Sequence, residues 1–179
     1  MCKKLVIDIE SNGFKGSSVL SFSALVLDDN NQVIEEIDRY YYPVENINKI
    51  AVGINGLYRK VVKIKREGIT YPEHFIDDVD FIKKLFSDCD EVIAHNVDFD
   101  ISFVSEVFPL AVDIMDFCTM LESTNILCIP GNYGNNKWPK LEEAVNYFKI
   151  DTSEFGGDFH SGLFDCKCTL EVYKKMINE

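Results

Sequence analysis

The sequence predicts an α/β protein built around one mixed five-stranded sheet, with three antiparallel strands followed by parallel strands and with helices flanking the sheet. Three strand-like segments come first in the chain, joined by short turns. Strand and helix patterns then alternate to the C-terminus, an order typical of parallel strands with helices on the faces of their sheet. The chain has 179 residues, of which 46% are hydrophobic, so we expect residues 1–179 to form a single domain.

The first strand is predicted over residues 4–10, within the stretch KKLVIDIESNG. Successive side chains of a strand point to opposite faces, so Asp8 and Glu10 share one face. The apolar residues of the other face are Leu5, Ile7 and Ile9. A turn over Ser-Asn-Gly ends the strand.

A hairpin is predicted next, with strands over residues 19–27 and 32–42. The turn residues 28–31, which read DDNN, separate the two strands. With the first strand, this hairpin makes an antiparallel meander. Residues 49–66 are then predicted to be helical in part.

The middle of the chain alternates between helix and strand patterns. A helix is predicted within residues 75–86, whose apolar positions follow a helical period. A short buried strand over 91–95 precedes a helix over 96–108, with Asn96 as its cap. A further strand is predicted over 110–116. The apolar stripe of the first of these helices consists of Phe75, Val79, Ile82, Leu85 and Phe86.

Three helices are predicted in the last third of the chain. The first covers residues 117–122, and a loop rich in glycine and asparagine follows over 123–138. The second covers 139–148 and opens with a proline, which suits the first turn of a helix. The last covers 162–177.

The chain is acidic, with 18 basic and 30 acidic residues and a formal net charge of −12. This charge argues against tight, sequence-independent binding of long duplex DNA, but not against an enzyme that reaches phosphates through bound metal ions. No apolar run approaches the roughly 20 residues of a membrane span. The start, MCKKLVIDIE, reaches an acid too early for a signal peptide. We therefore expect a cytoplasmic protein without a membrane partner.

The six cysteines are scattered along the chain. Cys166 and Cys168 are the only close pair, and C-x-C without a second pair nearby is a poor zinc signal. We expect most of the cysteines to be reduced and buried.

Two carboxylates on one strand face, Asp8 and Glu10, repel each other unless a positive charge lies between them. A third acid comes from the predicted helix 96–108. Asp100 shares a stripe with the apolar residues three, four and seven positions after it, whereas Asp98 lies on a mostly polar stripe. We therefore expect Asp100 to point toward the core and Asp98 toward water.

Asp165, near the start of the last helix, also shares a stripe with apolar residues. An acid stabilised by the helix dipole, or a hydrogen-bonded structural acid, accounts as well for Asp100 or Asp165 taken alone. An inward carboxylate is otherwise unfavourable unless it is neutralised or bound to metal. Four such acids fit better with one shared cation site, and oxygen-only coordination favours magnesium or manganese.

Histidine occurs three times. His160 lies in GGDFHSGLFD, five residues before Asp165 and just outside the predicted helix, in a loop whose glycines leave it free to place a side chain over the site. We expect His74 to be solvated and His95 to be structural. Read alone, a histidine is more often a surface or core residue than a catalytic base.

Three short segments contain the four acids and His160, in this order along the chain: DIE at 8–10, AHNVDFD at 94–100 and HSGLFD at 160–165. Together they resemble the three motifs of the DnaQ-like DEDDh 3′→5′ exonucleases, the group that includes the proofreading subunit of bacterial DNA polymerase III. Each motif alone is weak, but all three in order, with H-x4-D in the last, are a strong match. The resemblance also covers INGLYRK, similar to the family's His-Gly-Ile segment, and WPKLEEAVNYFKI before the last motif.

The resemblance implies a ribonuclease H-like fold. It also implies that Asp8, Glu10, Asp100 and Asp165 hold two divalent metal ions, Mg²⁺ or Mn²⁺, with His160 as general base. In such sites the metals activate water and stabilise charge on the reacting phosphate. Because the base must be a neutral imidazole, activity is expected to favour neutral to alkaline pH. The H-x4-D spacing points away from the sister group that uses tyrosine.

Residues beside the metal ligands are expected to contact the substrate. This set consists of Ser11, Asn12, Gly13, Asn96 and Phe99. The chain departs from the family here, since its first motif reads DIESNG where relatives often have DTETTG. Asn55 stands where many relatives have histidine. The acids are kept, so these departures concern substrate contacts rather than metal binding.

The resemblance implies hydrolysis of phosphodiester bonds at the 3′ end of nucleic acid, single-stranded or frayed, with single-stranded DNA and a proofreading or repair role as the first expectation. A polymerase or another replication or repair protein is the expected partner. Because the family also holds RNA trimmers and enzymes that degrade short oligonucleotides, RNA is an alternative substrate. A non-catalytic module that binds nucleic-acid ends or a protein partner is a second alternative. The presence of all four acids and the histidine counts against it.

The sequence leaves the roles of two further segments open. The stretch YRKVVKIKR, from Arg59 to Arg66, either guides a phosphate backbone or is a solvated helix face. Tyr133 and Trp138, in the glycine- and asparagine-rich loop, either stack on a base or pack the loop. The oligomeric state does not follow from the sequence.

Overall fold

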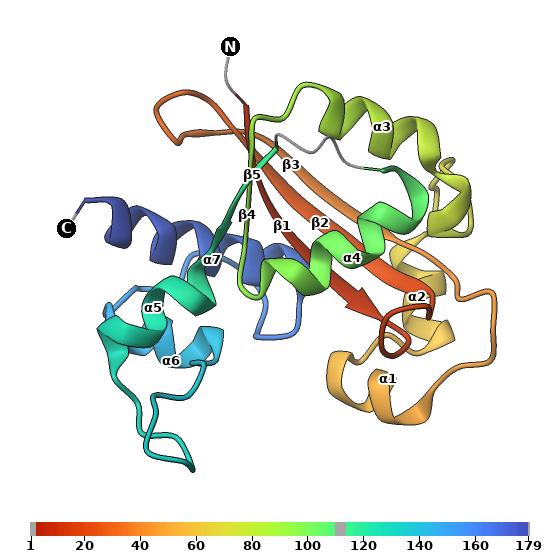
Figure 1. Cartoon of the computed structure of the whole chain (residues 1–179). Helices are drawn as coiled ribbons and strands as arrows, with labels where there is room; N and C mark the ends of the chain where they lie inside the picture. Colours follow the sequence, from red (N-terminus) through yellow and green to blue (C-terminus); the bar gives the residue numbers. More distant parts are fainter. Residues whose placement is uncertain (1–2, 110–113, 179) are drawn as a thin grey trace.

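The computed structural model describes residues 3–109 and 114–178, and its centre is a mixed sheet with the strand order β3-β2-β1-β4-β5 (Figure 1). The first three strands are antiparallel neighbours, and β4 and β5 run parallel to β1. The predicted fold class is confirmed. The strands are β1 (Lys4–Ser11), β2 (Val19–Leu27), β3 (Val33–Tyr40), β4 (Glu91–Ala94) and β5 (Met115–Cys118).

Helices connect and cover these strands. They are α1 (Lys49–Asn55), α2 (Arg59–Lys65), α3 (Val79–Ser87), α4 (Val97–Val107), α5 (Thr119–Leu127), α6 (Leu141–Tyr147) and α7 (Gly162–Ile177), and a 3-10 turn, Phe75–Asp77, precedes α3. None of these helices is long and apolar enough to cross a bilayer.

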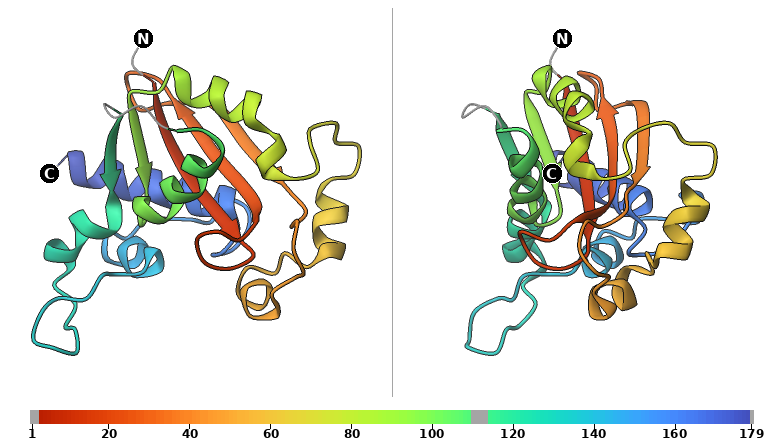
Figure 2. Two further views of the ribbon diagram at one scale, coloured as in Figure 1. Left: turned by 45° about the vertical axis from the view of Figure 1, so that its right-hand side comes forward. Right: turned by 90° about the vertical axis from the view of Figure 1, so that its right-hand side faces the viewer.

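Helices pack on both faces of the sheet, α3 and α4 on one and α7 on the other (Figures 1 and 2). The alternation along β1 explains the two cores. Ile7 joins a core with Phe86 of α3 and Phe103 of α4, whereas Val6 packs with Leu170 of α7. Helices α5 and α6 pack beside α7, and α1 and α2 form a separate cluster against the ends of β2 and β3.

The predicted helical segment 49–66 is divided into α1 and α2 by Gly56, whose φ of 70° ends α1 in the left-handed region that glycine adopts without strain. Asn96 stands at the N-cap position of α4, as predicted, but it does not cap the helix with its side chain. Its backbone is left-handed, with a φ of 86°, so the predicted side-chain cap is wrong.

The region after α4 differs most from the prediction. A strand was expected over 110–116, of which residues 110–113 lie outside the described part; β5 instead begins at Met115, where pairing with β4 starts. Helix α5 then runs on to Leu127, through the start of the predicted loop. The hydroxyl of Ser123 donates to the carbonyl of Thr119 within the helix, and Met120 packs in the main core. This core packing sustains a helix that its polar residues disfavour.

Of two smaller expectations, the predicted start of helix α6 is wrong and the burial of most cysteines is confirmed. Helix α6 begins at Leu141 rather than at the preceding proline, because the side chain of Glu143 accepts the backbone N–H of Lys140 and closes a cap there. Cys128 is exposed, and the other four described cysteines are buried, as expected for most of them.

Candidate active site

Three elements bring four carboxylates to the end of β1, at the lower side of the view in Figure 1. Strand β1 supplies Asp8 and Glu10 on the face covered by α7, and α7 supplies Asp165. Helix α4 supplies Asp100, whose Oδ1 accepts the backbone N–H of Ile9 at 2.8 Å. This hydrogen bond ties the start of α4 directly to the strand that carries the first two acids.

The predicted helical phase of α4 is confirmed. Asp100 is buried, with 4% of its surface exposed, whereas Asp98 is exposed to solvent. Only one of the two neighbouring acids therefore reaches the site.

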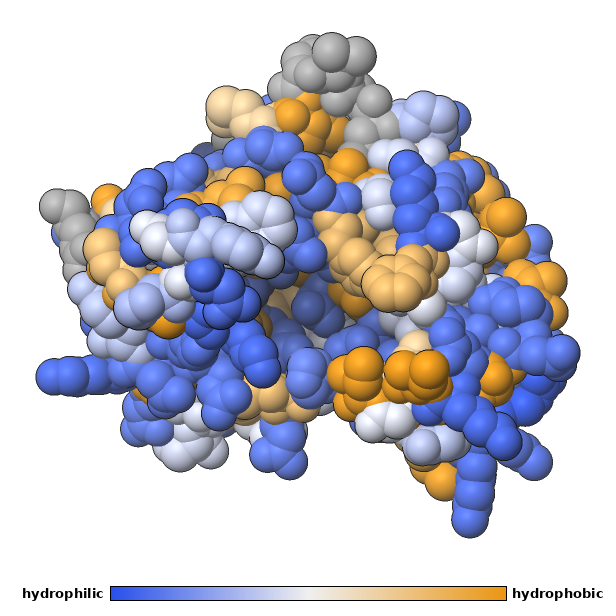
Figure 3. Space-filling view, turned by 60° about the horizontal axis from the view of Figure 1, so that its bottom comes forward, coloured by the Kyte–Doolittle hydropathy of each residue, from blue (hydrophilic) through white to orange (hydrophobic). Residues whose placement is uncertain are grey.

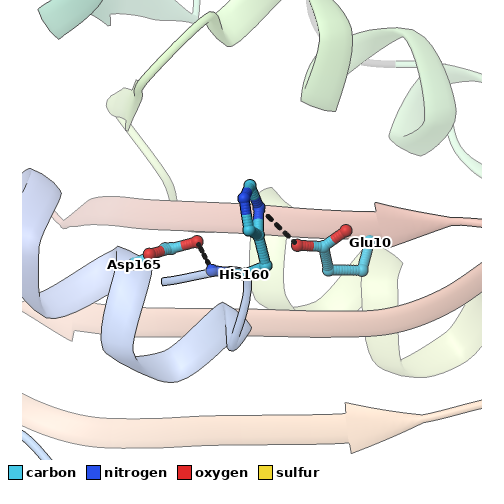
Figure 4. A group of neighbouring side chains, drawn as sticks. All are labelled: Glu10, His160 and Asp165. Carbon is cyan, nitrogen blue, oxygen red and sulfur yellow. Dashed lines mark hydrogen bonds and ion pairs between the residues drawn. The ribbon is translucent and has the colours of Figure 1, made fainter. Parts of the chain in front are cut away.

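His160 lies beside Glu10 and Asp165 (Figure 4). Its Nδ1 is 4.0 Å from Oε1 of Glu10, and its backbone N–H donates to Oδ2 of Asp165 at 2.9 Å. One ligand atom from each of the three residues lies within 4.8 Å of the others. The His160 side chain is 61% exposed, so its imidazole is open to solvent while its backbone is held by Asp165.

The close approach of α7 to the sheet depends on Gly162. A Cβ at this position would overlap Oγ of Ser23 on β2 and lie 3.4 Å from Oδ2 of Asp8. Ser23 is itself fixed by donating to Oδ1 of Asp38 at 2.8 Å. The absence of a side chain at Gly162 therefore allows the start of α7 to place Asp165 next to Asp8.

The carboxylates raise one another's pKa. Burial, followed by repulsion from the neighbouring acids, raises the pKa of Asp8 well above the usual range. Burial also raises the pKa of Asp100 well above that range, against the lowering effect of the backbone N–H of Ile9. Burial and repulsion from Asp165 raise the pKa of Glu10 to about 7. Burial likewise raises the pKa of Asp165 to about 7, against the lowering effect of the His160 N–H. At neutral pH the site therefore favours whatever neutralises it, either protons or cations.

The donor set fits divalent metal ions. Oδ2 of Asp8 and Oδ1 of Asp165 are buried without a hydrogen-bond partner, which is costly for a carboxylate oxygen unless a cation or solvent completes it. No lysine or arginine in the described part of the chain forms an ion pair with any of the four acids. Clustered carboxylate oxygens are the ligands that Mg²⁺ and Mn²⁺ prefer.

The residues predicted to contact substrate differ in burial and in hydrogen bonding. Asn12 is 1% exposed, and its amide donates to Oε1 of Glu45 at 2.7 Å and accepts the N–H of Asn48 at 2.8 Å. Its side chain therefore holds the loop after β1, and its contact with substrate stays a prediction. Ser11 is also buried, and its hydroxyl donates to the carbonyl of Gly13.

On α4 the two expected contacts also differ in setting. Asn96 is exposed at the start of the helix, whereas the ring of Phe99 is half-buried and packs edge-on against Phe103 with 5.0 Å between ring centroids.

Two residues lie outside the predicted site residues: the sequence pattern assigned no role to Phe14, and it marked Asn55 only as a departure from the family. Phe14, directly after the first motif, is 90% exposed, and its signal was a lone aromatic in the polar stretch SNGFKGSS. Asn55 donates to the carbonyl of Ser11 at 3.1 Å, and its side-chain hydrogen bond lowers the pKa of Glu10 against the dominant effect of burial. The residue that replaces the family's histidine thus links α1 to the end of β1.

The remaining histidines are structural. His95 contacts Oγ1 of Thr119 and the carbonyl of Pro139, both at 3.0 Å, as expected for a structural residue, and burial lowers its pKa. His74 was expected to be solvated, but it is half-buried and its Nδ1 lies 2.7 Å from the carbonyl of Tyr42, so that expectation is wrong.

The face at which β1 ends is turned toward the viewer in Figure 3 and is hollowed near its centre, with hydrophilic side chains and separate hydrophobic patches around the hollow. The segment between α5 and α6 projects from the body of the molecule (Figures 1 and 2). On it, Tyr133 is 94% exposed and Trp138 is 66% exposed, so the Tyr133 ring does not pack the loop.

Comparisons with known proteins agree with this geometry. The family model RNase_T, described as an exonuclease, matches residues 5–173. A comparison with curated protein sequences found no match. Among solved structures, Exonuclease X in complex with 5′ overhanging duplex DNA is 18% identical, with 98% of this chain and 91% of that chain covered and a TM-score of 0.68.

Two structures of E. coli Exonuclease I are also similar in fold. The complex with a dT13 oligonucleotide is 18% identical with a TM-score of 0.71, and the zinc-bound complex with single-stranded DNA is 19% identical with a TM-score of 0.72. They cover 98% and 97% of this chain, but the chain spans only 41% and 40% of theirs. The family match over nearly the whole sequence, together with the three motifs on this fold, shows that the chain belongs to the RNase_T exonuclease family, as a DEDDh-type member of the ribonuclease H-like superfamily.

Proposed function

We propose that this protein is a metal-dependent 3′→5′ exonuclease that removes nucleotides from the 3′ end of single-stranded nucleic acid, with DNA as the first substrate. The observation that carries the proposal is the convergence of four acids, two buried and two half-buried, beside an exposed histidine, with two carboxylate oxygens lacking a hydrogen-bond partner. This arrangement argues against a non-catalytic binding module, because clustered acids withdrawn from solvent destabilise the chain unless they bind cations.

Each residue has a role in this proposal. Asp8, Glu10, Asp100 and Asp165 would hold two divalent cations, which when bound supply Lewis-acid stabilisation of the charge on the reacting phosphate. His160 takes the proton from a water as its oxygen attacks the terminal phosphorus. The bond from that phosphorus to the 3′ oxygen of the preceding nucleotide breaks, this oxygen takes a proton from solvent to become a 3′-hydroxyl, and a nucleoside 5′-monophosphate leaves.

The surroundings of His160 suit a general base. Its side chain is exposed, so it can reach a water at the open side of the site. Oε1 of Glu10, 4.0 Å from Nδ1, stabilises the positive charge that the imidazole gains when it takes the proton. Asp165 accepts the backbone N–H of His160 and so fixes the loop that presents the ring.

Single-stranded ends are supported by charge and by the structural neighbours. A chain with a net charge of −12 is a poor binder of long duplexes. Exonuclease I is similar in fold and has been solved with the single-stranded oligonucleotides dT13 and dA16, and Exonuclease X with duplex DNA bearing a 5′ overhang. RNA is the alternative substrate that the family leaves open.

One assay tests the direction of degradation, the preference for DNA or RNA, and the requirement for metal. Single-stranded DNA, duplex DNA and RNA of one sequence, each labelled at either end in turn, are incubated with magnesium, with manganese or with a chelator. We expect shortening from the 3′ end of the single strand, and none in chelator. Release from the 5′ end, or degradation that persists in chelator, contradicts the proposal, and a preference for RNA selects the alternative. The polymerase or repair partner, the cytoplasmic location and the single domain stay predictions.

A further inference from the structure

Helix α2 belongs to a positively charged segment of an acidic chain. No acid occurs between Glu45 and Glu67, and this interval holds six of the 18 basic residues. Of the other 12 basic residues, six form an ion pair with a carboxylate of the described chain, as Lys4 does with Glu91 at 3.0 Å. In the part of the chain that the structure describes, no ion pair involves a basic residue of this interval.

The two arginines of this segment have structural contacts. Arg66 is half-buried, and its guanidinium donates to the carbonyls of Tyr40 and Tyr71. The guanidinium of Arg59 lies over the ring of Tyr42, 5.1 Å from its centroid. These contacts account for the arginines without any ligand.

The lysines of α2 are different, because Lys60, Lys63 and Lys65 are all exposed. Like charges three or four residues apart on a helix destabilise it slightly, and α2 has no acid to offset them. Among the lysines of this helix, Lys65 places its ammonium group 5.0 Å from the centroid of the Tyr40 ring. Lys63 and Lys65 lie in the last turn of α2, where the helix dipole slightly favours cations, but this effect does not apply to Lys60. Folding therefore accounts for the three cations only in part.

The position of Lys65 relates this charge to the active site. Lys65 and His160 line the same cavity of about 170 Å³, together with Asn55 and Leu57. None of the described residues that line it is an acid, although the four carboxylates of the site are close by. The cavity therefore suits an anionic group that lies next to the reacting phosphate.

We propose that α2 binds the phosphate backbone of the single strand on the 5′ side of the bond that is cleaved. Lys65 contacts a phosphate in the cavity that it shares with His160. Lys60 and Lys63 contact phosphates farther along, where they line a second hollow of about 580 Å³. Glu67 and Glu73 also line this second hollow, so it is mixed in charge and Lys65 is the strongest contact. This inference rests on the proposed function and adds which helix holds the strand.

Binding is the first test. A fluorescein-labelled dodecathymidylate is titrated at several salt concentrations, with calcium in place of magnesium to slow cleavage, against Lys65→Gln and the double variant Lys60→Gln/Lys63→Gln. The slope of log K against log salt is negative, and each lost phosphate contact reduces its magnitude by roughly 0.7 for a single strand. We expect that decrease for Lys65→Gln and about twice that decrease for the double variant. Lys83→Gln, at an exposed position of α3, is the matched control and leaves the slope unchanged.

Turnover separates strand binding from chemistry. For Lys65→Gln we expect KM for the dodecathymidylate to rise by roughly threefold to fivefold, the range of an exposed ion pair. Hydrolysis of the p-nitrophenyl ester of thymidine 5′-monophosphate, which has no strand beyond one phosphate, stays at the wild-type rate. If Lys65→Gln and Lys83→Gln give the same slope and the same KM, the inference is overturned. If the wild-type protein hydrolyses neither substrate, the proposed function fails instead, and the salt slope still decides whether α2 binds the strand.

Discussion

The metal-free protein should lose stability as the pH rises, and Glu10 allows the size of this loss to be worked out. Burial and repulsion from Asp165 raise the pKa of Glu10 from its ordinary value of 4.5 to about 7 in the folded chain. The folded state therefore holds this proton more tightly than the unfolded state does. The stabilisation that results is complete below about pH 4.5 and is lost as the pH rises through about 7.

The magnitude follows from the shift. Each pKa unit corresponds to about 1.4 kcal/mol, so Glu10 contributes a loss of roughly 3 kcal/mol between these two pH values. The Asp165 carboxyl shifts in the same direction, but the repulsion between the two acids is shared, so their losses do not add.

Urea denaturation in chelator, repeated across this pH range, measures the effect. Glu10→Gln removes the titrating group, so we expect this variant to be more stable than the wild type above pH 7 and to lose less stability as the pH rises. Glu35→Gln, at an exposed position of β3, is the control and should follow the wild type. Magnesium or manganese should remove most of the wild-type loss. A wild-type free energy of unfolding that stays level or rises with pH in chelator would refute the reasoning.

Three further predictions follow from the site. Asp100→Ala should abolish nuclease activity while Asp98→Ala keeps most of it, because only Asp100 is buried at the site; similar losses in both would mean that the motif is misaligned. His160→Ala should keep its metal affinity, measured by calorimetric titration, yet lose turnover on the order of a hundredfold to ten-thousandfold, and a near wild-type rate would rule this residue out as the base. Gly162→Ala should cost about 1–3 kcal/mol in urea denaturation, because its Cβ overlaps Ser23. In a double-mutant cycle, Ser23→Gly should recover much of that cost, and full additivity would show that the overlap is relieved elsewhere.

Local periodicity was enough to predict much of the fold and of the site. The two-residue period of β1 predicted that Asp8 and Glu10 would share a face, and the helical period of α4 separated Asp100 from Asp98. These predictions succeeded because the apolar residues of each element are packed in a core, which fixes the phase of the whole element.

The features that the sequence did not predict depend on contacts between residues that are far apart in the chain. The amide of Asn12 is taken up by Glu45, 33 residues away, so the motif around it gave no sign that the side chain turns inward. β5 is set by its pairing with β4 and not by the apolar pattern that precedes it. Helix α5 is sustained in part by the packing of Met120 in the main core.

Two opposite electrostatic environments lie side by side on this fold, and both follow from where the acids are. The four carboxylates at the end of β1 are buried or half-buried and close together, so the metal-free site is destabilised at neutral pH and gains most from cations. Next to it, the acid-free interval between Glu45 and Glu67 places Lys65 in a cavity lined by no described acid. A nucleic-acid strand needs both environments at once, because its reacting phosphate must approach carboxylates while its other phosphates avoid them. The overall charge of −12 is therefore compatible with a polyanionic substrate, since cations at the carboxylates and lysines on α2 would reverse the sign of the charge along the path of the strand.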